Sequence, residues 1–206
     1  MTGTDLTPLP PGQVPVAPPN MPRVKPSRFN RWCARTLLKL SGWHIAGELP
    51  DVPKLVMIVA PHSSNWDGLW GMAVKIACGF EVKVLAKASL FWWPLGPILH
   101  KLGVVPVDRA NAGGVVRQAV ETIRSYERIW FVVTPEGTRK RVDKWKSGFY
   151  KIAVTAQVPV LMAYFHYPEK TVGVGPLFYP TGDAEADMAA IRAWYAQWMG
   201  KHRGSA

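Results

Sequence analysis

The chain has few cysteines and few acidic residues for its length. Only two of the 206 residues are cysteine, too few for a disulfide scaffold or for a metal site built on several thiolates. Asp and Glu number 14 against 25 Lys and Arg, so the formal net charge is +11. Such a surplus calls for an anionic partner: nucleic acid, an anionic membrane surface or a phosphorylated ligand.

Long apolar runs are missing as well. A helix that spans a bilayer needs about 18 apolar residues in succession. The longest runs here are residues 55–60 and 90–99, and prolines interrupt the second. We therefore expect no membrane-spanning helix. Residues 1–26 have no basic stretch followed by an apolar one, so we expect no secretory signal either.

Several functional motifs are absent too. The sequence lacks the glycine-rich motifs of nucleotide-binding proteins and the G-x-S-x-G turn that carries the nucleophilic serine of many hydrolases. Its His, Cys and carboxylate residues nowhere cluster at the spacing of metal ligands. We therefore expect neither a nucleotide cofactor nor a metal ion.

Proline is concentrated at the amino-terminal end. Residues 1–26 contain eight of the 19 prolines and no periodic apolar pattern, which predicts a disordered or polyproline-like tail.

A basic amphipathic helix is predicted over residues 27–44, with Ser27 as its N-cap. Basic side chains recur on one side of it, and aromatic and aliphatic ones on the other. This pattern is typical of a helix that lies in a membrane interface, but the apolar side could equally pack against the domain. The basic residues are Arg28, Arg31, Arg35 and Lys39, and the apolar side holds Phe29, Trp32, Thr36, Leu37, Leu40 and Trp43.

Residues 45–206 alternate between short apolar runs and helical patterns. This alternation predicts an α/β domain with a central mixed, mostly parallel sheet flanked by helices. The expected strands are residues 55–60, 82–86, 104–107, 129–134, 159–165 and 170–174. The expected helices are residues 67–78, 91–101, 112–128 and 147–157, with a last helix capped by Asp183.

The segment of residues 61–68, Pro-His-Ser-Ser-Asn-Trp-Asp-Gly, follows a predicted strand and opens a predicted helix. His62 and Asp67 are spaced so that a turn can bring the carboxylate to one imidazole nitrogen and leave the other nitrogen as a general base. Taken alone, the spacing also fits a helix-capping Asp beside a hydrogen-bonded His.

Three further segments lie at strand ends. Residues 103–109 are a strand that ends in Asp108 and Arg109, where α/β proteins commonly bind ligands. Residues 134–141, Thr-Pro-Glu-Gly-Thr-Arg-Lys-Arg, combine a glycine turn with a basic run suited to phosphate, although such a run is also typical of a solvated loop. Residues 158–160 open the next strand, and Lys87 stands at another strand end.

Together these segments resemble, in order and spacing, the glycerolipid acyltransferase family, which includes the lysophosphatidic acid (1-acylglycerol-3-phosphate) acyltransferases. That family carries H-x-x-x-x-D, G-x-x-[FP]-[IV]-x-R, F-P-E-G-T-R-S and V-P-[IV] blocks. The matching segments here are His62 to Asp67, Gly103 to Arg109, residues 135–139 and Val158-Pro159-Val160, within roughly residues 30–200. Departures from the pattern are Pro61, Thr134 and Lys140, which stand where the family often has Asn, an aromatic residue and Ser.

The resemblance implies acyl transfer from an acyl-CoA or acyl carrier protein thioester to a hydroxyl of a lysophospholipid such as 1-acylglycerol-3-phosphate, in phospholipid biosynthesis. His62 is then the general base that Asp67 orients, and no further cofactor is needed. We expect a peripheral or monotopic protein on the cytoplasmic face of an anionic membrane, and no nucleic-acid partner. The expected substrate-binding residues are Lys87, Arg109, Glu136, Gly137, Thr138 and Arg139.

Two other functions remain open from the sequence. A His–Asp pair with a phosphate-binding loop would also serve a hydrolase of acyl thioesters or lipids, with water in place of the acceptor hydroxyl. A lipid-binding module without enzymatic activity would explain the charge and the basic helix, but it gives no reason for His62 and Asp67.

Overall fold

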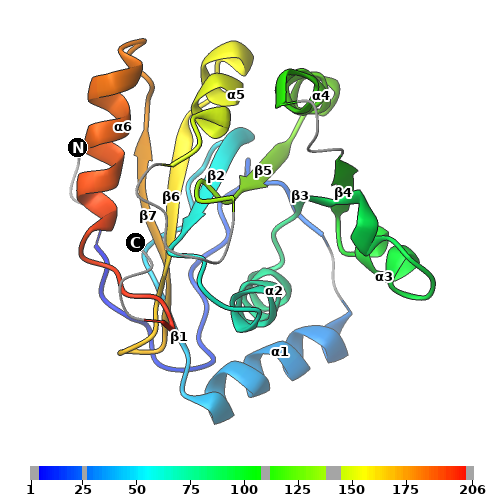
Figure 1. The fold of residues 1–206 in the computed structure, drawn as a ribbon. Coiled ribbons are helices and arrows are strands. Elements are labelled where there is room, and N and C mark those ends of the chain that lie inside the picture. Colours follow the sequence, from blue (N-terminus) through cyan, green and yellow to red (C-terminus); the bar gives the residue numbers. More distant parts are fainter. Residues whose placement is uncertain (1–4, 25–26, 108–111, 138–144, 203–206) are drawn as a thin grey trace.

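A computed structural model describes residues 5–24, 27–107, 112–137 and 145–202. Within these residues the fold is a seven-stranded sheet with helices on both faces (Figure 1). The strands are β1 (His44–Ala46), β2 (Lys54–Ala60), β3 (Val82–Lys87), β4 (Val104–Val107), β5 (Ile129–Val133), β6 (Val160–His166) and β7 (Thr171–Phe178). The helices are α1 (Arg28–Ser41), α2 (Trp66–Cys78), α3 (Leu95–Lys101), α4 (Ala112–Ser125), α5 (Gly148–Ala156) and α6 (Ala184–Tyr195), with a short 3-10 turn, η1 (Ala88–Leu90).

The strand order is β1-β7-β6-β2-β5-β3-β4. Five neighbouring strands, from β6 to β4, run parallel, and β7 returns antiparallel beside β6 before pairing in parallel with β1. The predicted mixed, mostly parallel sheet is therefore confirmed. The structure differs locally from the predictions. Strand β1 was not predicted, because it is too short to leave a periodic signal, and the strand expected over residues 170–174 runs on to Phe178. The helix expected over residues 91–101 begins only at Leu95, after Pro94.

Helices α1 and α2 lie on one face of the sheet, and α4, α5 and α6 lie on the other (Figure 1). A core of buried side chains lies between the sheet and each of these layers. Because successive side chains of a strand point to opposite faces of the sheet, β2 contributes side chains to both cores. Leu55 and Met57 point toward α1 and α2, whereas Val56 and Ile58 point toward α4, α5 and α6. Strand β2 is thus buried on both sides at the centre of the sheet, and the segment that follows it starts from a rigid position.

The proline-rich segment packs on the domain over residues 5–24, so the prediction of a disordered tail was wrong for these residues. Leu9 N donates to Ile45 O at 2.8 Å, and Pro22 O accepts from Glu81 N at 2.9 Å. Met21 is buried in the core on the α1 side. Prolines restrict the backbone before folding, so ordering this segment costs less conformational entropy than ordering an ordinary extended chain.

Helix α1 exists where it was predicted, and it packs on the domain through the side that carries Ala34 and Leu38. Ala34 and Leu38 are buried, and the small Ala34 side chain leaves room for α2 to approach. Phe29, Trp32 and Leu40 remain 68%, 62% and 82% exposed. The interpretation that this side packs on the domain was therefore wrong for these three residues, whereas Trp43, just after the helix, is buried in the core.

An apolar groove of about 280 Å³ runs between α1 and α2. It is lined mainly by aliphatic side chains, among them Leu37 of α1 and Leu69, Met72 and Ile76 of α2. None of the described helices is long and apolar enough to cross a membrane.

Candidate active site

The candidate site lies where three neighbouring parallel strands end. Strand β2 has β6 on one side and β5 on the other. Because parallel strands present their carboxyl ends at the same edge, the segments after β6, β2 and β5 meet there. They carry Tyr167, His62 and Glu136, respectively. The topology of the sheet therefore gathers residues that are far apart in the sequence.

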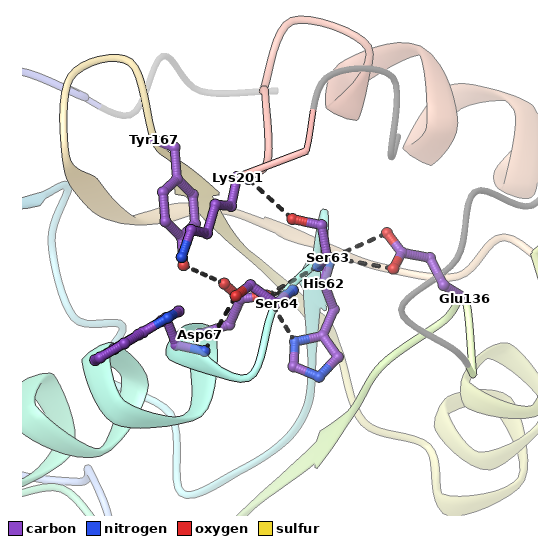
Figure 2. Close-up of polar contacts among 8 residues, drawn as sticks. His62, Ser63, Ser64, Asp67, Glu136, Tyr167 and Lys201 are labelled. Atoms are coloured by element: carbon purple, nitrogen blue, oxygen red, sulfur yellow. Dashed lines mark hydrogen bonds and ion pairs between the residues drawn. The ribbon is translucent and has the colours of Figure 1, made fainter.

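His62 and Asp67 form the predicted pair (Figure 2). His62 Nδ1 is 3.1 Å from Asp67 Oδ2, the Asp67 carboxylate is buried, and the imidazole keeps some contact with solvent. Asp67 lies in the first turn of α2, where a negative charge is favoured by the helix dipole. With the proton held at Nδ1, the opposite nitrogen Nε2 is the one suited to accept a proton.

The Asp67 carboxylate is heavily hydrogen-bonded. Its Oδ2 accepts from the main-chain N–H groups of Ser63 and Ser64, both at 2.9 Å, and its Oδ1 accepts from the Tyr167 hydroxyl. Burial raises the pKa of Asp67, but the hydrogen bonds from His62, Tyr167 and Ser64 outweigh it and leave the pKa below its usual value. Asp67 is therefore ionised at neutral pH, as the partner of an imidazolium must be.

Glu136 holds the same loop from the other side. Both of its carboxylate oxygens accept from the His62 main-chain N–H, at 3.1 and 3.0 Å (Figure 2). The side chain is only 2% exposed. Burial raises the pKa of Glu136 to about 7, the His62 N–H opposes this rise, and the nearby Asp67 charge adds to it. Among the described residues, this buried acid is therefore paired with a main-chain N–H of the His62 loop.

Gly137 gives the loop after β5 its sharp turn. Its φ is +66°, in the left-handed region that favours glycine. A Cβ at this position would lie 3.1 Å from atoms of the Lys146 side chain. The absence of a Cβ at Gly137 therefore lets the Lys146 side chain lie against the backbone next to Glu136.

The segment around Lys201 contacts the loop that follows β2. The main-chain N–H of Lys201 donates to Ser63 Oγ at 2.9 Å, and the Lys201 ammonium lies 5.2 Å from the centroid of the Trp66 ring. Ser64 Oγ accepts from Trp66 N at 3.2 Å. The two serine hydroxyls therefore stabilise the loop between His62 and Asp67.

The structure brings together only part of the predicted substrate site. Glu136 and Gly137 lie beside the His62 loop, and Lys87 is the last residue of β3, at the same edge of the sheet. Arg109, Thr138 and Arg139 lie outside the described residues.

Sequence analysis missed Tyr167, Ser63 and Lys201 as members of this site. The position of Tyr167, directly after a strand predicted to neighbour others in parallel, was the one available signal.

Comparisons with known proteins agree with this fold. The model of the acyltransferase family matches residues 48–165, which is more than half of the chain. The chain therefore belongs to the acyltransferase family.

Two individual proteins show the extent of the similarity. The 1-acyl-sn-glycerol-3-phosphate acyltransferase of Streptococcus pneumoniae (strain ATCC BAA-255 / R6) is 24% identical over 140 residues, which make up 64% of this chain and 49% of that protein. The chain thus spans about half the length of this curated relative. The crystal structure of the 1-acyl-sn-glycerophosphate (LPA) acyltransferase PlsC from Thermotoga maritima superposes with a TM-score of 0.50 at 20% identity, covering 73% of this chain and 70% of that chain. The similarity to the Thermotoga maritima structure concerns the fold alone.

Proposed function

We propose that this protein transfers a fatty acyl group from an acyl-CoA or acyl carrier protein thioester to a hydroxyl of a lysophospholipid such as 1-acylglycerol-3-phosphate. The observation that carries the proposal is the buried Asp67 carboxylate at 3.1 Å from His62 Nδ1, at the carboxyl ends of the central strands of an acyltransferase-family fold. The name of the Streptococcus pneumoniae relative supports the choice of 1-acylglycerol-3-phosphate as acceptor.

In the proposed reaction His62 Nε2 removes the proton from the acceptor hydroxyl. The oxygen then forms a bond to the thioester carbonyl carbon, the carbon–sulfur bond breaks, and the proton passes from His62 to the departing thiolate. Asp67 holds His62 in the required tautomer and stabilises the imidazolium. General-base catalysis of this kind contributes a factor of about 10²–10⁴, and the remainder comes from positioning and charge stabilisation.

We place the acceptor phosphate at the loops after β4 and β5. Arg109 is the proposed phosphate ligand, and Glu136, Gly137, Thr138 and Arg139 shape this part of the site, in line with the family motifs. Lys87 ends the neighbouring β3 and is proposed to contact the phosphates or thioester of the donor. The excess of positive charge in the sequence supports an anionic ligand here.

We also propose that the protein docks on the cytoplasmic face of an anionic membrane through the exposed side of α1. Phe29, Trp32 and Leu40 would enter the lipid interface. The support is that these apolar side chains point away from the domain. A lysophospholipid acceptor is itself a membrane component, so docking would bring the enzyme to its substrate.

A screen of the purified protein tests the function. Labelled acyl-CoA and acyl carrier protein donors are offered with a panel of lysophospholipids, and products are identified by lipid mass spectrometry. We expect a diacyl product with 1-acylglycerol-3-phosphate. Free fatty acid released at equal rates with and without a lysophospholipid would instead identify a hydrolase, and vesicle binding without any turnover would identify a binding module.

A further inference from the structure

The turn between β6 and β7 supplies a hydroxyl to the candidate dyad. Tyr167 lies directly after the last residue of β6, and its hydroxyl donates to Asp67 Oδ1 at 2.5 Å (Figure 2). The other oxygen, Oδ2, accepts from Ser63 N and Ser64 N and contacts His62 Nδ1. The two carboxylate oxygens are thus divided between the His62 loop and a residue 100 positions further along the chain.

The tyrosine is held in place independently of Asp67. Its ring packs edge-on against Trp43, with ring centroids 5.1 Å apart and planes at 89°, and Trp43 is buried in the core. Its main-chain N–H donates to Met199 O at 2.9 Å. The hydroxyl therefore approaches Asp67 from a fixed direction, which a mobile side chain could not provide.

We propose that Tyr167 is a positioning residue of the His62–Asp67 dyad, holding the carboxylate in the orientation that meets His62 Nδ1 and drawing part of its charge onto Oδ1. This inference rests on the proposed function. Rotation about the last side-chain bond of aspartate is soft. A donor on Oδ1 restrains that rotation, while the N–H groups on Oδ2 restrain it from the other side.

The hydroxyl also sets how strongly the dyad binds a proton. A hydrogen bond to an ionised carboxylate favours the ionised form, and Tyr167 is among the groups that lower the pKa of Asp67. Burial and the bond to Asp67 in turn raise the pKa of Tyr167 above its usual value, so its hydroxyl stays protonated and remains a donor. Without this donor, Asp67 would keep more of its charge facing the imidazole and the dyad would take up a proton at higher pH.

Tyr167→Phe tests the proposal, because it removes the hydroxyl and keeps the ring against Trp43. We expect kcat for acyl transfer to fall about tenfold with little change in the acceptor KM, which corresponds to about 1.4 kcal/mol in the barrier. We also expect the acid limb of the kcat/KM profile to move to higher pH. A kcat and a pH profile equal to those of the wild type would overturn the proposal.

The chain offers a matched control in Tyr150. Its hydroxyl donates to Asp187 Oδ2 at 2.8 Å in a buried pair between α5 and α6, on the face of the sheet opposite to α2. Tyr150→Phe also removes a tyrosine–carboxylate hydrogen bond, and we expect it to lower the melting temperature without changing the pH profile. If both variants change the kinetics in the same way, Tyr167 acts only through stability and the proposal is wrong.

A double-mutant cycle with Asp67→Asn separates this inference from the proposed function. If Tyr167 acts through Asp67, Tyr167→Phe has no further effect on the residual rate of the Asp67→Asn variant. A wild-type rate in Asp67→Asn would contradict the proposed dyad itself. A strongly reduced rate there, together with unchanged kinetics in Tyr167→Phe, would contradict only the role of Tyr167.

A second variant covers the case in which Tyr167→Phe does not fold. Site-specific incorporation of 3-fluorotyrosine at position 167 keeps the hydrogen bond and makes the hydroxyl a stronger donor. We expect the acid limb of the kcat/KM profile to move to lower pH, opposite to the shift expected for Tyr167→Phe. An unchanged acid limb would overturn the proposal.

Discussion

The main-chain N–H of His62 points at both carboxylate oxygens of Glu136, at 3.1 and 3.0 Å, although 74 positions separate the two residues in the sequence. This contact joins the loop after β2 to the loop after β5. The glutamate therefore has a structural partner inside the site, and its protonation is coupled to the backbone that carries the candidate base.

The raised pKa of Glu136 predicts a pH-dependent stability. The folded chain holds the Glu136 proton up to a pKa of about 7, whereas the unfolded chain releases it near the usual pKa of 4.5. The contribution of Glu136 to the free energy of unfolding is thus fully present below pH 4.5 and decreases as the pH rises toward 7. The total change is on the order of 3 kcal/mol. The free energy of unfolding in urea, measured between pH 4.5 and 7, checks this prediction.

Glu136→Gln is the matched variant for this measurement. The amide keeps a carbonyl acceptor for the His62 N–H but has no titrating proton. We expect the unfolding free energy of the variant to decrease less between pH 4.5 and 7 than that of the wild type. Parallel curves for the two proteins would show that Glu136 has an ordinary pKa in the folded state.

His62→Ala is expected to abolish acyl transfer and leave the fold intact. The imidazole is partly exposed at the edge of the sheet, so its loss removes the proposed base without opening the core. We expect kcat to fall at least 10²-fold, the lower end of the effect of general-base catalysis. Steady-state kinetics and circular dichroism measure the two properties. A wild-type rate from the purified variant would remove His62 from the mechanism.

Gly137→Ala is expected to destabilise the loop after β5. Alanine in the left-handed region costs about 1–2 kcal/mol, and its Cβ would press on Lys146. We expect lower stability and a lower kcat/KM, because the turn positions Glu136 against His62. Gly148→Ala is the control, since a Cβ there meets nothing within 4 Å at the start of α5. Equal effects from both variants would contradict this account of the turn.

Ser63→Ala is expected to loosen the segment around Lys201. The variant loses the hydroxyl that accepts from Lys201 N, and a hydrogen bond of this kind contributes about 1 kcal/mol. Hydrogen exchange at the Lys201 amide should become faster. Ser125→Ala, at an exposed hydroxyl that donates to Thr122 O, should leave the Lys201 exchange rate unchanged. Unchanged exchange in Ser63→Ala would show that the contact does not hold this segment.

Replacing Trp32 and Leu40 together by Ala is expected to weaken membrane binding at least tenfold, because burying one such side chain contributes about 1.5–3 kcal/mol. Co-sedimentation with vesicles of phosphatidylcholine and phosphatidylglycerol measures the affinity. Tyr179→Ala removes a similarly exposed aromatic side chain outside α1 and serves as the control. Equal affinities for the double variant and the wild type would exclude α1 as the docking surface.

Much of the fold could be predicted because its signals are local. Apolar runs such as residues 55–60 and capping residues such as Ser27 and Asp183 act over a few positions, and the structure confirms the elements that they predict. The side of α1 that packs on the domain could not be predicted in this way. An amphipathic pattern shows that two sides differ, but only the neighbouring helix α2 decides which of them is covered.

The sequence by itself determined the His62–Asp67 pair, because five positions and one turn are enough to bring the two side chains together. Tertiary structure alone decided that Tyr167 and Glu136 complete the surroundings of this pair. Their contacts depend on which strands lie beside β2, and strand order is set by packing across the whole sheet. The packing of residues 5–24 on the domain has the same origin, since their partners at Ile45 and Glu81 lie on distant parts of the chain.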